Sequence, residues 1–521
     1  MASSKLSRSV AVAVSIPLAI YIAHTLIMGS WIVDDAGISF AYARNLAEGY
    51  GLVAQPGADP VEGFTNLLWV LLLAIPLKFH AFDPVITPKL LSGICVTLSF
   101  ISMGSLLKSS CDGSAWLTSS ALAISALIPG FAIWNASGLE NPLYILGLSL
   151  LAVNVSKRTG PGRRGLQRAI ATGTILFLVF CTRPDGALYF WIPPFLLGLE
   201  KRSHNHRRSL AAYTAAFIIP WLLLTAFRLL YFHDVLPNTF YAKRGEGSAI
   251  FAWLLDHRPL FFAGIIMMVV GTAVITTIAF AVYQLGRKIQ RRIPEESIPK
   301  HIPGLFLLTA IIVYAALRGD WMGEYRFATP AFLFGPATIL LILREIYFRM
   351  RLKRALPLLV PLIPLLMIPV GILSFRHTLD YSKSPALSFA SVREMSLRIA
   401  NTLEIHGLGP DTTILTPDIG GALWENRFRV IDLVGLIDRE MGRMAPRHRG
   451  RFRHYLLNVR KPDGIYLHEF WMKFTGIERN PVFIIMYLPL WEERDSPGLR
   501  PRAGFYLRRG LLEKENKYSS N

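Results

Sequence analysis

Charged residues and cysteines are both scarce in this chain of 521 residues. Only 17% of the residues are charged, whereas 52% are hydrophobic, and this balance excludes intrinsic disorder and collagen-like repeats. The 3 cysteines, Cys95, Cys111 and Cys181, do not follow the spacing of a metal site. A disulfide-stabilised scaffold is therefore excluded, and we interpret the cysteines as small buried residues.

Acidic residues are few compared with basic ones, at 35 against 55, which gives a formal net charge of +20. A soluble chain with this charge could bind nucleic acid, but no basic aromatic module accompanies the basic residues here. Instead they gather in short clusters at 157–168, 201–208, 287–300 and 349–354, between apolar segments. Such clusters are typical of cytoplasmic loops in membrane proteins, so we predict the lipid bilayer, and not nucleic acid, as a partner.

Long apolar runs support the same interpretation. A helix needs about 20 apolar residues to cross the hydrocarbon core of a bilayer. Runs of this kind lie at 10–28, 90–107, 210–232 and 261–285. The first run follows Lys5 and Arg8 and is longer than the apolar core of a signal peptide. We therefore predict an uncleaved first membrane helix with a cytoplasmic N-terminus.

The charge clusters also limit how many segments cross. About twelve apolar segments precede residue 375, but if all of them crossed, the N-terminus and the basic clusters could not all lie in the cytoplasm. Crossings can be counted forward from the cytoplasmic N-terminus and backward from the basic clusters. The two counts agree only if the segment 64–80 does not cross. It is short before Pro76, so we predict an interfacial helix along the outer surface. About eleven crossings remain, with the tail outside.

The tail from 375 to 521 has a different pattern. Short β-rich runs alternate with polar helical stretches, which predicts a compact α/β domain. The β-rich runs are 413–416, 429–433, 464–467 and 482–487. The predicted architecture is thus an α-helical polytopic membrane domain over 1–374, with 31–88 as its first outward loop, followed by an extracytoplasmic α/β domain over 375–521.

Unusual polar residues gather in the outward loops. Asp34 and Asp35 follow the first membrane helix directly and begin a predicted surface helix, where the helix dipole stabilises ionised carboxylates. One interpretation is a catalytic base, and the other is simple helix capping. Glu62 in the same loop and Glu140 in a later one lie at helix ends on the same side.

Cations occupy the same side of the predicted membrane. Arg183, Lys243 and Arg326 each lie in an outward turn at a helix end. Together they would form a cationic site for a phosphate, since Arg is suited to bidentate contacts. The alternative for Arg183 is an ordinary ion pair with Asp185. A lipid phosphate, an apolar groove and a carboxylate that accepts a proton would support glycosyl transfer with inversion.

At these residues the sequence resembles bacterial membrane glycosyltransferases of the GT-C superfamily, which use polyprenyl-phosphate sugars. The group it is most similar to is the mycobacterial terminal β-1,2-arabinofuranosyltransferase family with its wider relatives. The residues that carry the resemblance are 34–45, 62–66, 236–243, 319–326, 418–420 and 430–436. Their order along the chain is more specific than any one motif, and it spans most of the sequence.

This resemblance implies the GT-C fold, with juxtamembrane helices in the first outward loop, and an inverting transferase in the bacterial cytoplasmic membrane. The active site and the tail would face the periplasm or exterior, and the acceptor would be a cell-envelope glycan or glycolipid. Arabinofuranose is one candidate sugar, because relatives with these motifs use different ones. Asp34 and Asp35 hold the base role between them. The candidates for the donor phosphate are Lys243, Arg326, Arg183 and Arg44, and those for sugar or acceptor are Asp320, Trp321, Glu140, Asn238 and Glu62.

Three alternatives stay open at the level of sequence. A divalent cation could sit beside the acids, although adjacent Asp residues are a weak ligand signal. A transporter or flippase of lipid-linked sugars is the rival function, but no internal repeat is visible. The basic run 439–453 is either a solvated face or a site for an anionic ligand.

Overall fold

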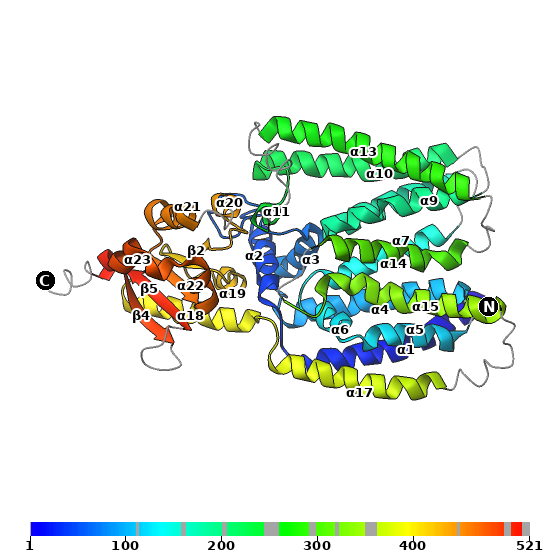
Figure 1. Cartoon of the computed structure of the whole chain (residues 1–521), viewed down its shortest axis with the longest axis horizontal. Coiled ribbons are helices and arrows are strands. Elements are labelled where there is room, and N and C mark those ends of the chain that lie inside the picture. The colour runs from blue at the N-terminus through cyan, green and yellow to red at the C-terminus, as the bar shows by residue number, and fades with distance from the viewer. Residues whose placement is uncertain are drawn as a thin grey trace.

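The structure is a computed structural model, and it describes residues 2–110, 114–157, 163–200, 206–243, 260–290, 298–317, 322–349, 362–444, 449–493 and 502–512. It has two parts (Figure 1): long helices lie side by side in one, and a small α/β unit covers one end of them. The fold class predicted from the sequence, a polytopic helical protein with a C-terminal α/β domain, is confirmed.

Apolar helices of the N-terminal part build the bundle. They are α1 (Ala2–Ile27), α4 (Ile86–Ser110), α5 (Ala115–Leu127), α6 (Pro129–Asn135), α7 (Asn141–Ser156), α8 (Arg163–Thr182), α9 (Ile192–Leu199), α10 (His206–Phe227), α13 (Leu260–Ile289), α14 (Ile298–Ala316), α15 (Thr329–Arg349) and α17 (Leu362–Lys383). Buried aromatic and aliphatic side chains fill the space between them, among them Phe100, Phe131 and Phe306. Many side chains on the outer helix faces are apolar and exposed, such as Leu223 at 66%, as expected of helices that face lipid.

The number of crossings differs from the prediction. Among the described residues, 6 helices are long and apolar enough to cross a membrane, or up to 7 if the bent pair α5 and α6 forms one span. The expected count of about eleven is therefore not reproduced there. One reason is proline: the predicted segment 186–199 divides into a 3-10 helix, η1 (Pro184–Trp191), and α9. Another is length, because α7 has only 16 residues.

Two helices of the first loop lie at the covered end of the bundle. Figure 1 shows α2 (Asp34–Glu48) running across that end, beside α3 (Leu67–Lys78). At 12 residues, α3 is only about 18 Å long, which is too short to span a bilayer. It buries Trp69 and Leu73 and exposes Leu71 and Ile75. The segment 64–80 thus contains a helix too short to cross, as the sequence predicts; its interfacial position stays a prediction.

The C-terminal unit is built on a 5-stranded sheet of order β2-β1-β3-β5-β4. Its strands are β1 (Thr413–Thr416), β2 (Arg429–Asp432), β3 (Gly464–His468), β4 (Tyr487–Glu493) and β5 (Ala503–Arg508). The first three pair in parallel, and β5 pairs antiparallel with β3 and β4. Its helices are α18 (Phe389–Ile405), α19 (Gly420–Glu425), α20 (Arg439–Arg443), α21 (Arg449–His454), α22 (Glu469–Thr475) and α23 (Pro481–Met486).

One of the four β-rich runs was predicted wrongly. Residues 482–486 belong to helix α23, and only Tyr487 begins a strand. The reason is a local start signal: Pro481 occupies the first turn, and the Asn480 side chain accepts a hydrogen bond from the Val482 N–H. Helix capping thus overrides the β propensity of the apolar run.

Asp432 organises the turn that follows β2. It is fully buried and accepts hydrogen bonds from the N–H groups of Val434, Leu436 and Ile437. Burial raises its pKa from 3.8 to about 6. Because the folded-state pKa lies above the unfolded one, its contribution to stability is complete below about pH 4 and is lost as the pH rises through about 6.

We therefore expect the advantage of the wild type over Asp432→Asn, in free energy of unfolding, to shrink between pH 4 and pH 7. The expected change is roughly 3 kcal/mol at most. Thermal unfolding in detergent across this pH range measures it. Asp411→Asn, at a carboxylate whose side chain is 96% exposed, serves as the control and should show little pH-dependent difference. An advantage that grows with pH would contradict the prediction.

Candidate functional site

The two adjacent acids at the start of α2 have different surroundings. Asp34 is only 4% exposed. Its Oδ2 accepts the N–H of Gly420 at 3.0 Å, and its Oδ1 accepts the N–H of Gly421 at 2.8 Å, at the N-terminus of α19. Burial, and after it the charge of Asp418, raises the pKa of Asp34 well above its usual range. Asp34 therefore connects α2 to the C-terminal unit.

Further contacts fix α2 against the same unit. The backbone of Val33 pairs with that of Ser388. Arg44 donates to the carbonyl of Leu423 at 3.2 Å and also to that of Trp424. Its guanidinium lies 5.3 Å from the Trp424 ring centre. Asp34 thus binds N–H groups at the N-terminus of α19, and Arg44 binds carbonyl groups at its C-terminal end. Arg44 therefore has a docking role in this structure.

Asp35 faces the other way. Its side chain is 26% exposed, and its Oδ2 lies 3.9 Å from Nη1 of Arg326. Arg326 is only 8% exposed. Its guanidinium also lies near the Trp134 and Phe327 rings, at 5.9 and 5.5 Å from their centres. An accessible carboxylate therefore lies next to a largely buried cation at the covered end of the bundle.

Glu140 links Arg326 to a second arginine. Its Oε1 accepts a hydrogen bond from Nη1 of Arg183 at 3.1 Å and lies 3.6 Å from Nη2 of Arg326. Its Oε2 accepts from the Asn66 amide at 3.0 Å. Burial opposes ionisation of Glu140, but the two guanidiniums outweigh it and lower the pKa of this carboxyl below its ordinary value. Arg183 binds Asp185 as well, at 3.1 Å.

The backbone before Arg326 has an uncommon conformation. Gly323, Glu324 and Tyr325 have φ values of 74°, 49° and 52°, so two residues with side chains adopt the left-handed region. The Trp134 indole donates to the carbonyl of Glu324 at 3.0 Å. Local strain of this kind persists only where surrounding contacts impose it, and here those contacts place Arg326 beside Asp35.

Other predicted site residues have internal partners. Glu62 is buried and accepts two hydrogen bonds from Arg228, at 2.8 and 2.9 Å. The Asn238 amide donates to the carbonyls of Gly435 and Leu436, at 2.7 and 2.9 Å. These contacts connect the first loop to the bundle and α11 (Asn238–Ala242) to the C-terminal unit.

Lys243, Asp320 and Trp321 are not placed in the Asp35–Arg326–Glu140–Arg183 network. The Lys243 side chain is exposed just after α11, and no ion pair among the described residues joins it to that network. Asp320 and Trp321 lie outside the residues that the structure describes. Within the described part, no group of three His, Cys, Asp or Glu side chains is arranged to hold a metal ion.

The basic run 439–453 has a partly structural role. Nη2 of Arg443 donates to both carboxylate oxygens of Asp234, at 2.8 and 2.9 Å, and Arg439 lies 3.5 Å from the same carboxylate. Arg451 is exposed. The run therefore combines bundle contacts with a solvated face.

Arg228 is a residue that the sequence analysis missed. It lies in the short π-helix η2 (Arg228–Phe232), at the end of an otherwise apolar run. A lone arginine in such a run must find a buried acid, and this signal could have identified it. The sequence does not say which acid, because Glu62 is far away along the chain.

Comparison with known proteins gives limited matches. Residues 388–511 match a family described as a domain of unknown function (DUF8728). No curated protein matches the chain. Among solved structures, the chain is similar to the crystal structure of ArnT from Cupriavidus metallidurans bound to undecaprenyl phosphate. The two are 13% identical with a TM-score of 0.45, and the alignment covers 98% of this chain and 99% of that chain. The family match thus begins at Ser388, the residue that pairs with Val33 beside Asp34.

Proposed function

We propose that the protein is an inverting membrane glycosyltransferase of the GT-C type. It would take a sugar, with arabinofuranose as one candidate, from a polyprenyl phosphate and add it to a cell-envelope glycan or glycolipid outside the cytoplasmic membrane. The observation that carries the proposal is the accessible Asp35 carboxylate beside the buried guanidinium of Arg326, at the end of a helical bundle and beneath a separate α/β unit (Figure 1).

In this proposal Asp35 is the general base. An acceptor hydroxyl attacks C1 of the sugar, and its proton goes to the Asp35 carboxylate as the new C–O bond forms. The bond from C1 to the phosphate oxygen breaks, and the polyprenyl phosphate leaves with the electron pair. Attack opposite the leaving group inverts the configuration at C1. Asp34 does not take this role, because both of its oxygens accept backbone hydrogen bonds from α19.

Arg326 is the proposed contact for the donor phosphate. Its separation of 3.9 Å from Asp35 is long for an ion pair, so a phosphate would compete for the guanidinium effectively. Binding of the donor would then release Asp35 from its cation when the base is needed. Glu140 and Arg183 act as positioning residues, since they hold Arg326 through buried contacts.

The Asp35–Arg326–Glu140–Arg183 network and Asp185 together contain more negative than positive groups, so a bound phosphate would need one further cation. Asp35, Glu140 and Asp185 bring three carboxylates, whereas Arg183 and Arg326 bring two guanidiniums. A third positive group would therefore help to neutralise a bound phosphate. Lys243, which is exposed just after α11, is the proposed source.

A transfer assay tests the function. Purified protein in liposomes receives a panel of radiolabelled polyprenyl-phosphate sugars, including arabinofuranose, together with extracted envelope glycans. We expect label in the glycan from one donor and release of polyprenyl phosphate in equal amount. Movement of a labelled lipid between leaflets without a new glycosidic bond would instead support a transporter and would overturn the proposal.

A further inference from the structure

A recess lies among the helix ends farthest from the C-terminal unit. It is lined by the end of α7, the start of α8, the end of α9 and the start of α10, and it holds about 450 Å³, part of it open to solvent. At about 1.5 Å per residue, α8 separates Arg168 in this recess from Arg183 by roughly 20 Å. The recess is therefore distinct from the candidate active site.

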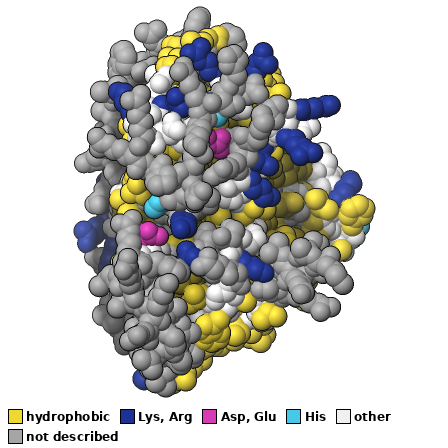
Figure 2. Space-filling view, turned by 90° about the vertical axis from the view of Figure 1, so that its right-hand side faces the viewer, with side chains coloured by type: hydrophobic (Ala, Val, Ile, Leu, Met, Phe, Trp, Pro, Cys, Tyr) yellow, Lys and Arg dark blue, Asp and Glu magenta, His cyan; other side chains and the backbone are white. Residues whose placement is uncertain are grey.

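Among the described charged side chains at this end of the molecule, basic ones are more frequent than acidic ones (Figure 2). Figure 2 shows Lys and Arg spread over the face, with few Asp or Glu among the atoms that are described. Exposed arginines at the helix starts contribute to it: Arg163, Arg164, Arg207 and Arg208. A bilayer leaflet rich in anionic lipid attracts such a face as a whole, without holding one lipid molecule in place.

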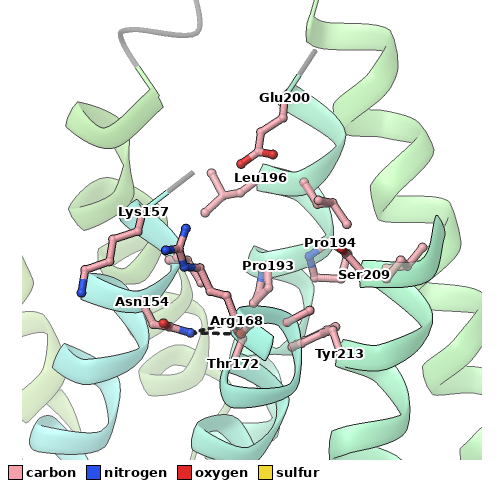
Figure 3. A pocket seen from close by; sticks show the side chains of 14 residues that line it. Asn154, Lys157, Arg168, Thr172, Pro193, Pro194, Leu196, Glu200, Ser209 and Tyr213 are labelled. Atoms are coloured by element: carbon pink, nitrogen blue, oxygen red, sulfur yellow. Dashed lines mark hydrogen bonds between the residues drawn. The ribbon is translucent and has the colours of Figure 1, made fainter. Parts of the chain in front are cut away.

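The recess itself combines charge with apolar walls. Figure 3 shows Arg168 in the space between Lys157 on the α7 side and Glu200 on the α9 side. Glu200 is the acid among the lining residues, and it also lies 3.7 Å from His206. Leu196 and Leu210 form apolar wall between α9 and α10.

A hydrogen bond makes the cationic side of the recess rigid. The Asn154 amide donates to Oγ1 of Thr172 at 2.7 Å and to the Arg168 carbonyl at 3.4 Å (Figure 3). This contact connects α7 to α8 and so fixes the backbone of Arg168 relative to Lys157. Both cations therefore border a pocket of defined shape, whereas the exposed arginines nearby do not line it.

We propose that this recess binds the phosphate of an anionic glycerophospholipid. Lys157 and Arg168 would contact the headgroup phosphate, and the acyl chains would continue along the apolar surfaces of the neighbouring helices. A lipid fits better than a free anion, because the charged groups adjoin apolar wall at the end of a membrane-spanning bundle. This inference does not depend on the proposed transferase activity.

Lipid retention tests it. Native mass spectrometry counts the phosphatidylglycerol molecules retained by protein that is extracted from mixed phosphatidylglycerol and phosphatidylcholine vesicles. Thermal unfolding measures the increase in melting temperature that the bound lipid causes. We expect about a fivefold loss of retention in Lys157→Gln and roughly 30-fold in the double variant with Arg168→Gln. The matched control, Arg207→Gln with Arg208→Gln, removes the same charge outside the recess and should lose much less.

The outcomes are distinct. Equal loss in the recess and control variants would overturn the proposal, because surface charge alone would then explain retention. A further measurement adds inorganic phosphate to protein in phosphatidylcholine vesicles and records the melting temperature. If phosphate by itself raises this temperature and the shift disappears in Lys157→Gln, the site binds free anions, and the proposal of a lipid ligand is overturned. Since Lys157 is exposed, its single variant keeps the test valid even if Arg168→Gln fails to fold.

Discussion

Asp35→Asn is expected to lower the rate of sugar transfer by about 10²- to 10⁴-fold, because it removes the proposed general base while leaving a side chain of the same size. Donor binding should be retained or become tighter, since Arg326 stays in place and loses only a competing anion at 3.9 Å. Expression and thermal unfolding should match the wild type, because the Asp35 side chain is 26% exposed and its ion pair with Arg326 is long, at 3.9 Å. Single-turnover transfer with saturating donor measures the effect.

Asp34→Asn is the matched variant, and the opposite result is expected. Asparagine has one carbonyl oxygen for the two N–H groups of Gly420 and Gly421 that the carboxylate accepts. The variant should unfold more easily by about 1–3 kcal/mol. Below its melting temperature it should transfer sugar within about tenfold of the wild type. Full activity in Asp35→Asn together with complete loss in a folded Asp34→Asn would reverse the assignment of the base.

Which of the two acids is buried and which is accessible could not be predicted from sequence. Consecutive residues on a helix point about 100° apart, so Asp34 and Asp35 must face different surroundings. Which of them faces the C-terminal unit depends on how α2 packs against α19. Asp34 of α2 and Gly420 of α19 are 386 residues apart along the chain. The sequence therefore indicates the pair, whereas the three-dimensional contacts distinguish its members.

Features that depend on local pattern were predicted better. Strands β1 and β3 follow short β-rich runs, and the surface helix at 64–80 followed from charge and segment counting. Turns carrying Asp35, Glu140, Arg183 and Arg326 were all assigned to one side of the membrane, and the structure joins them in one network. Their individual pairings depend on side-chain geometry, which periodicity does not encode.

The contact between α2 and α19 also explains two glycines. A Cβ on Gly37 would lie 2.6 Å from the backbone carbon of Gly420, and a Cβ on Gly420 would lie 1.8 Å from the carbonyl oxygen of Asp34. Neither distance is compatible with van der Waals contact. The two helices thus approach so closely only because both positions lack a side chain.

Gly420→Ala is consequently expected to separate α19 from α2. The added methyl group meets backbone and not a flexible side chain, so the helix itself must move, and the two hydrogen bonds to Asp34 should break with it. Overpacking combined with the loss of these bonds should destabilise the folded protein by about 3 kcal/mol or more. Hydrogen exchange at the amides of residues 420 and 421 should accelerate, and thermal unfolding should shift downward.

Gly409→Ala is the control for this substitution. Gly409 lies in the same unit, and no atom comes within 4 Å of the position that an added methyl group would occupy, so the change should alter stability by less than about 0.5 kcal/mol. A Gly420→Ala protein with wild-type exchange at these two amides would show that α2 and α19 do not pack as described. Faster exchange with sugar transfer retained at low temperature would show that Asp34 serves docking, because the reaction at Asp35 would then proceed without the α19 contact.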